Sequence, residues 1–193
     1  YTLSLHDALP IYDYIGVESL MKINQTLDEQ PDVDVVFLDA IKVFKDGKTI
    51  PLGDGYKKEL IYYKTQREVI NHLTELPKFP GSACTKLIKR SLINKYKLYF
   101  KKGLLSEDID WTIRLLLVAK KFNYCKFDYY YYRQQREGSI TNTVNLKNIE
   151  SLMYIIKKWS HNLKQQSINK FQKQINIFKI GRASCRERVY GEC

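Results

Sequence analysis

The sequence of 193 residues lacks most of the patterns that mark metal sites, disulfide frameworks and membrane spans. Its four cysteines show neither CxxC nor Cys/His spacing, so we expect no zinc site and interpret Cys84 and Cys125 as buried free thiols in a reducing compartment. The longest aliphatic run, residues 115–119, is too short to cross a bilayer. No basic start followed by an apolar core marks a signal peptide. We therefore expect a soluble segment.

Glycine-rich phosphate loops and histidine clusters are also missing. Gly53 and Gly55 are too isolated to form a phosphate cradle. The three histidines, His6, His72 and His161, share no local motif, and we interpret none as a ligand.

Acidic residues are few relative to basic ones, with 21 against 32 and a net charge of +11. The excess is concentrated near the end, because residues 151–179 contain six lysines and no acid. Such a charge predicts attraction to phosphates, nucleic acid or a lipid surface. An apolar content of 44% and an aromatic content of 13% fit one folded domain with a sizeable core.

The chain also lacks an initiator methionine. Its first residues, YTLSLHDALPI, and its last, IGRASCRERV onward, resemble peptides translated from sequencing-adapter DNA at the edge of an assembled contig. We therefore expect residues 1–11 and 180–193 to be foreign to the protein, and both ends of its gene to be missing. These segments carry charges of −1 and +1, so the basic character belongs to residues 12–179.

The hydrophobic pattern predicts an alternation of helices and strands, which indicates an α/β fold. Helical periodicity is typical of residues 15–29, 66–76, 91–96, 106–121 and 146–163. Extended segments are expected at residues 33–38, 40–44 and 124–132, with a tight turn at Asp46-Gly47. The amphipathic period continues beyond residue 163 through Ile168, Phe171, Ile175 and Phe178.

The segment GLLSEDIDW, residues 103–111, gathers three acids ahead of an apolar helix. Ser106 is a good helix N-cap, and Glu107, Asp108 and Asp110 suit the positive end of the helix dipole. Capping is therefore the simpler interpretation. The alternative is a general base, because a carboxylate fixed at a loop-to-helix junction can have its pKa raised by partial burial.

Basic and aromatic clusters leave similar alternatives open. Lys86, Lys89 and Arg90 form either a solvated face or a contact with a phosphate-bearing substrate. The aromatic run at residues 129–132 favours strand packing over a stacking platform. Arg133 and Arg136 follow that strand in a loop, where solvent exposure is the simpler interpretation.

The order of these segments resembles the C-terminal half of bacterial family-two glycosyltransferases. KLIKRS at residues 86–91 is similar to the family's KLYKRS, and FKKGLLSEDIDW at 100–111 to its F.EG…EDI.W pattern. YR at 132–133 with GSIT at 138–141 is similar to its Y.YR.R.GSIT. YDYIGVESLMKI looks like the DDYI…LE.L that follows the family's metal-binding Asp-x-Asp. Two departures are Cys84 near a place that often holds Trp, and Leu87-Ile88 in place of Leu-Tyr.

The resemblance, which covers residues 12–160, implies a partial GT-A (Rossmann-like) α/β fold without its N-terminal nucleotide-binding strands and with C-terminal amphipathic helices. Residues 12–145 would form the acceptor-side part and residues 146–179 a basic helical tail. It implies an inverting, hexosyltransferase-like enzyme in surface-polysaccharide synthesis, with Asp108 as general base and Glu107 as a second candidate or positioning group. The substrate-binding residues implied by position are Lys86, Arg133, Arg136 and Ser139.

The same resemblance implies a nucleotide-sugar donor and a glycan or lipid-linked acceptor. A divalent Mg or Mn ion is expected in the full-length enzyme, with no metal on this chain because the Asp-x-Asp motif would lie before Tyr12; we expect the chain to be inactive alone. The expected location is the cytoplasm, and an alternative is peripheral attachment to the anionic inner face of the cell membrane. The alternative is a non-catalytic nucleic-acid-binding or membrane-surface module, although no nucleic-acid-binding motif is present.

Overall fold

A computed structural model describes residues 13–52, 55–134 and 146–165, with side chains described as far as Trp159. Within these residues the chain forms a five-stranded mixed sheet of β1 (Tyr14–Ile15), β2 (Val35–Val43), β3 (Thr49–Pro51), β4 (Lys86–Ile88) and β5 (Phe122–Arg133). The helices are α1 (Ser19–Glu29), α2 (Gln66–Glu75), α3 (Arg90–Tyr96), α4 (Glu107–Val118) and α5 (Leu146–Gln165), with 3₁₀ turns at Lys58–Leu60 and Ala83–Thr85.

The centre of the sheet is β2, whose first half is a run of buried apolar residues, as expected for a strand covered on both faces. It runs parallel to β5, from Val35 opposite Phe122 to Val43 opposite Arg133. Its other edge pairs antiparallel with β4 near its start and with β3 near its end. The short β1 adds antiparallel to the outer edge of β5.

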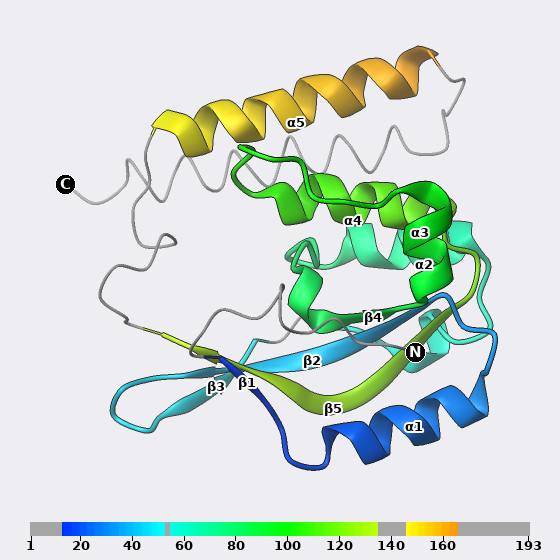
Figure 1. Cartoon of the computed structure of the whole chain (residues 1–193), viewed down its shortest axis with the longest axis vertical. Helices are drawn as coiled ribbons and strands as arrows, with labels where there is room; N and C mark the ends of the chain where they lie inside the picture. Colours follow the sequence, from blue (N-terminus) through cyan, green and yellow to red (C-terminus); the bar gives the residue numbers. More distant parts are fainter. Residues whose placement is uncertain (1–12, 53–54, 135–145, 166–193) are drawn as a thin grey trace.

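Helices cover both faces of the sheet in layers (Figure 1). Figure 1 shows α1 on one face, α2, α3 and α4 on the other, and α5 lying outside α4. One core cluster joins Phe37 and Phe122 of the sheet to α2 and α4, and a second joins Leu38 and Tyr129 to α1. A third cluster packs Trp159 of α5 against α4. None of the helices in the described part of the chain is long and apolar enough to span a membrane.

The predicted helices and strands are confirmed, with three corrections. The first helix begins at Ser19 instead of residue 15, because Ile15 pairs with Tyr130 in β1. The two extended segments at 33–38 and 40–44 form a single strand, β2, whose register against β5 is interrupted around Asp39. The strand β4 was not predicted at all. The foreign ends and the periodic residues from 168 to 178 lie outside the described residues.

Candidate active site

The first turn of α4 carries the three acids of the segment at residues 103–111 (the ED segment), but the side chain of Ser106 does not cap the helix. Ser106 has left-handed backbone angles, φ 57° and ψ 33°, and its side chain makes no capping hydrogen bond. Ser106 therefore occupies the predicted N-cap position, but the predicted capping by its side chain is wrong, because a capping residue needs extended backbone angles to aim its hydroxyl at the helix N–H groups. Glu107, Asp108 and Asp110 do lie in the first turn, where the helix dipole favours negative charge.

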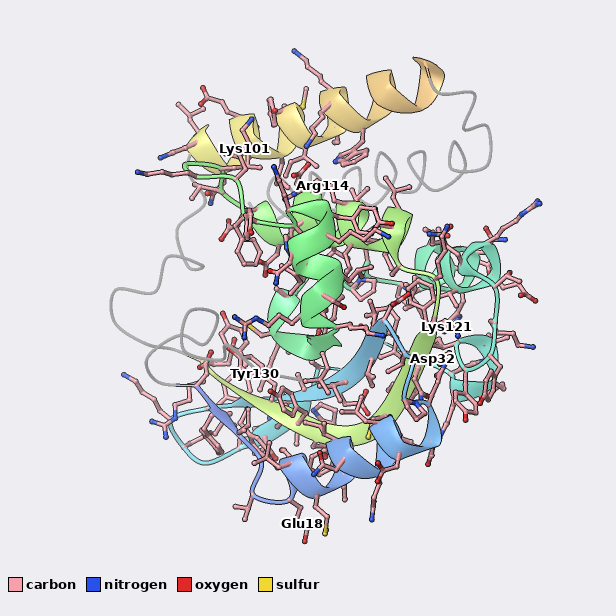
Figure 2. All side chains as sticks on the ribbon, turned by 45° about the vertical axis from the view of Figure 1, so that its right-hand side comes forward. Glu18, Asp32, Lys101, Arg114, Lys121 and Tyr130 are labelled. Carbon is pink, nitrogen blue, oxygen red and sulfur yellow. The ribbon has the colours of Figure 1, made fainter. Side chains whose placement is uncertain are left out.

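Asp110 is a structural residue that fastens α5 to α4. Its side chain is buried, and its Oδ1 accepts hydrogen bonds from Lys158 Nζ at 2.6 Å and Trp159 Nε1 at 2.9 Å. Its Oδ2 accepts from Arg114 Nε at 3.1 Å. Figure 2 shows Arg114 on α4 where that helix faces α5. Because all these donors are in place, Asp110 is fully engaged in holding the two helices together.

Asp108 instead turns toward the loop that leads into β4. Its Oδ2 accepts a 3.2 Å hydrogen bond from the backbone N–H of Ala83. The loop is fixed to α4 at a second point, where Thr112 Oγ1 donates to Gly81 O at 2.7 Å. A Cβ at Gly81 would lie 3.1 Å from Ile109 Cγ1, so only glycine allows this close approach without a shift. The loop and α4 thus hold the Asp108 carboxylate in a defined place.

The environment of Asp108 raises its pKa above the ordinary aspartate value. Partial burial is the largest cause, and the negative charge of Glu107 acts in the same direction. The Ala83 N–H bond and the charge of Lys86 act in the opposite direction. A half-buried carboxylate whose pKa is raised is a better proton acceptor than an ordinary surface aspartate.

A second carboxylate, on the sheet side, lies near Cys84. Asp13, just before β1, accepts hydrogen bonds from Tyr130 Oη at 2.5 Å and from the Arg133 N–H at 3.0 Å. Cys84 lies within hydrogen-bonding reach of Tyr130, and burial raises the pKa of its thiol, with the charges of Asp108 and Asp13 adding to the effect. The thiol is therefore neutral and feels the charge of both carboxylates.

Lys86 is buried under the loop. Its Nζ donates to Pro80 O at 2.8 Å and to Ser82 O at 2.5 Å, and it lies 5.9 Å from the centre of the Phe37 ring. The charge that was predicted to bind a substrate is directed at backbone carbonyls. Its role toward a substrate stays a prediction.

The other predicted residues are distributed around this site. Glu107 is half-buried beside Asp108 at the start of α4. Arg133 is exposed at the end of β5, with its guanidinium 5.4 Å from the centre of the Tyr14 ring. Arg136 and Ser139 lie outside the described residues. The structure therefore brings Asp108, Glu107 and Lys86 together and places Arg133 next to Asp13.

No three His, Cys, Asp or Glu side chains come together as a possible metal site among the described residues. The Mg or Mn ion expected from the resemblance stays a prediction.

A shallow hollow of about 340 Å³ lies away from this site, next to the start of β5. Tyr63, Lys64 and Phe122 line it, and the Asp32–Lys121 ion pair forms part of its wall. Figure 2 shows Asp32 and Lys121 beside each other and Tyr130 further along the sheet. The hollow is therefore separate from the Asp108 site.

Sequence reasoning missed Asp13, Tyr130 and the Ala83 N–H as parts of the site. Asp13 had a usable signal, because it stands in the YDYIG segment that looks like the family pattern. Tyr130 was interpreted only as strand packing. A backbone N–H has no sequence signal, since every residue except proline carries one.

Comparison with known proteins supports the fold. No protein-family model and no characterised protein sequence matches the chain. The crystal structure of S. aureus TarS 1–349 in complex with UDP-GlcNAc is similar, with a TM-score of 0.50 and 22% identity over 75% of this chain. A second crystal structure of TarS 1–349 gives a TM-score of 0.46 and 18% identity, covering 82% of this chain and 47% of that one.

TarS is a staphylococcal glycosyltransferase, so this chain has part of a glycosyltransferase fold. The match with the UDP-GlcNAc complex covers 39% of the TarS chain. The predicted α/β class and the partial glycosyltransferase architecture are thereby confirmed.

Proposed function

We propose that the chain forms the acceptor side of an inverting glycosyltransferase that acts in surface-polysaccharide synthesis. The observation that carries the proposal is the carboxylate of Asp108. It is half-buried at the start of α4, held by the Ala83 N–H, and raised in pKa by its burial. The likeness in fold to TarS supports the same class of reaction.

In this reaction Asp108 takes the proton of an acceptor hydroxyl. The hydroxyl oxygen then forms a bond to the anomeric carbon of the donor sugar, on the face opposite the leaving group. The bond between that carbon and the diphosphate oxygen breaks, and the nucleoside diphosphate leaves with the bonding electrons. Glu107 keeps the region negative and favours the protonated product form of Asp108.

The donor in this proposal is a nucleotide sugar. UDP-GlcNAc, which is bound in the TarS crystal, is the first donor to test. Arg133, Arg136 and Ser139 follow or end β5, and we assign them to substrate binding as expected from the resemblance. Arg133 supports this through its exposed position beside Asp13.

The acceptor in this proposal is a glycan or a lipid-linked glycan, and the protein works in the cytoplasm at an anionic membrane face. Support comes from residues 95–102, KYKLYFKK. This segment contains four lysines together with the exposed side chains of Tyr96, Tyr99 and Phe100. Lys101 of this segment contacts α5 through Tyr154, at 2.5 Å between Nζ and Oη. Exposed aromatics beside lysines suit the boundary between headgroups and acyl chains.

The test is a transfer assay on the full-length protein, using labelled UDP-GlcNAc and the cell-envelope glycan as acceptor. Asp108→Asn should lower kcat by about 100- to 10,000-fold, the usual contribution of a general base. Asp46→Asn is the matched control, since Asp46 is exposed in the β2–β3 turn. Undiminished transfer by the Asp108 variant would overturn the base assignment.

A further inference from the structure

One peptide group links a buried cation to the proposed base. The carbonyl of Ser82 and the N–H of Ala83 belong to the same planar amide and point in opposite directions. Lys86 Nζ donates to the Ser82 oxygen at 2.5 Å, and the Ala83 N–H donates to Asp108 Oδ2 at 3.2 Å. The ammonium and the carboxylate therefore bind the two ends of a single dipole.

Lys86 holds its charge in a place where burial is energetically unfavourable for a cation. It begins β4 directly opposite Phe37 of β2, and the residue is 6% exposed. Burial of an ammonium group is unfavourable unless hydrogen bonds and opposite charge compensate for the lost water. Carbonyl oxygens of Pro80 and Ser82 supply hydrogen bonds, and Asp108 supplies opposite charge.

The loop does not depend on Lys86 alone for its shape. Thr112 holds Gly81 from α4, and Thr85 Oγ1 donates to the same Ser82 oxygen at 3.2 Å. Lys86 therefore adds a positive charge next to the Ser82 carbonyl, beyond the hydrogen bonds that already shape the loop. A cation at the carbonyl end polarises the amide, which strengthens the N–H at the other end as a hydrogen-bond donor.

We propose that Lys86 is a positioning residue for Asp108, acting through the Ser82–Ala83 peptide group, and is not a substrate ligand. It fixes the amide that orients the carboxylate and supplies a field that favours the ionised base. The other titratable groups that face Asp108 are Glu107, which favours protonation, and Cys84, whose half-buried thiol is neutral. The inference rests on the proposed function for its role in transfer, but the coupling itself needs no substrate.

The test uses carboxyl ¹³C NMR of the 193-residue chain labelled at aspartate, with Asp108→Asn to identify the Asp108 signal. Lys86→Met should raise the Asp108 pKa by about one pH unit, because the stabilising cation is lost. Lys86→Gln, which keeps two N–H donors for the carbonyls, should raise it similarly and covers the case in which the methionine variant does not fold. Lys48→Met removes an exposed lysine of the β2–β3 turn and should leave the Asp108 pKa unchanged.

An Asp108 pKa that stays unchanged in the folded Lys86 variants, or that moves equally in Lys48→Met, would overturn the proposal. In the transfer assay, Lys86→Met should move the acid limb of kcat/KM to higher pH and leave the donor KM unchanged. A raised donor KM without a shift in that limb would instead make Lys86 a substrate ligand. If the proposed transfer reaction fails altogether, the NMR titration still decides whether Lys86 and Asp108 are coupled.

Discussion

Lys86 and Asp108 bind opposite ends of one amide, with Lys86 Nζ 2.5 Å from Ser82 O and Asp108 Oδ2 3.2 Å from Ala83 N. This relationship separates Asp108 from the other acids of the ED segment. Asp110, two residues later, is saturated by side-chain donors from α4 and α5. Asp110 therefore holds α4 and α5 together, whereas Asp108 is oriented by the loop that leads into β4.

The two aspartates should differ in their effect on stability. Asp110→Asn removes the charge that Lys158, Arg114 and Trp159 share, and should lower the free energy of unfolding by about 3 kcal/mol, as for other broken buried pairs. Asp108→Asn keeps an oxygen that can accept the Ala83 N–H, and it removes a half-buried charge that Lys86 only partly offsets, so it should lower the free energy of unfolding by at most about 1 kcal/mol. Urea unfolding of both variants measures the difference. Equal losses would contradict the separate roles.

Ser106 offers a test of the backbone at the start of α4. Its left-handed φ of 57° is unfavourable for any residue with a Cβ, so Ser106→Gly should stabilise the protein by about 0.5–1 kcal/mol. Ser106→Ala should have little effect, since the hydroxyl caps nothing. A capping serine would give the opposite pattern, with a loss of about 1 kcal/mol in the alanine variant. Thermal or urea unfolding distinguishes these patterns.

Three tyrosines should make the fold sensitive to alkali. Burial raises the pKa of Tyr124, Tyr129 and Tyr130, to about 12 for Tyr129, and hydrogen bonds to Asp39 and Asp13 add to the effect for the other two. Above pH 10 the unfolded chain loses these protons while the folded chain retains them. Stability is therefore complete below pH 10 and falls as the pH rises beyond it.

Unfolding free energies between pH 8 and 11, with absorbance at 295 nm to follow tyrosinate, measure this loss. Tyr124→Phe should reduce the slope against pH, because one of the three groups is removed. A free energy of unfolding that stays constant from pH 9 to 11 would contradict the assignment.

Binding to vesicles tests the membrane partner. The chain should sediment with vesicles that contain anionic lipid and not with neutral ones. Lys101→Glu with Lys102→Glu should weaken binding by about ten-fold or more, since each lysine near an anionic surface contributes about 1 kcal/mol. Lys45→Glu with Lys48→Glu, in the exposed β2–β3 turn, makes the same change in net charge elsewhere. Equal losses in the two double variants, or tighter binding to single-stranded RNA than to vesicles, would contradict the proposal.

Sequence reasoning predicted the elements with strong local signals. The helix at residues 66–76 has a clear apolar period and a capping box between Thr65 and Glu68, and β5 is rich in aromatics. The strands β1 and β4 have two and three residues, and they exist because β5 and β2 offer free edges at those points. Segments this short carry no periodicity of their own, so their structure depends on tertiary pairing.

Sequence reasoning predicted some side chains of the candidate site but none of its backbone groups. The acids before the apolar helix left capping and general-base catalysis open, and Asp108 was identified as a candidate base only through the family resemblance. The group that holds Asp108 is a backbone N–H, and the partners of Lys86 are backbone carbonyls. Such groups are present at nearly every residue, so only the folded loop reveals which of them matter.

The most direct test of the account compares the pH dependence of sugar transfer with the titration of Asp108. The acid limb of kcat/KM reports the essential base of the free enzyme. It should coincide with the Asp108 pKa measured by carboxyl NMR, lie above the ordinary aspartate value of about 3.9, and disappear with the activity in Asp108→Asn. An acid limb that differs from the Asp108 pKa, or that persists in Asp108→Asn, would contradict the assignment of Asp108 as the base.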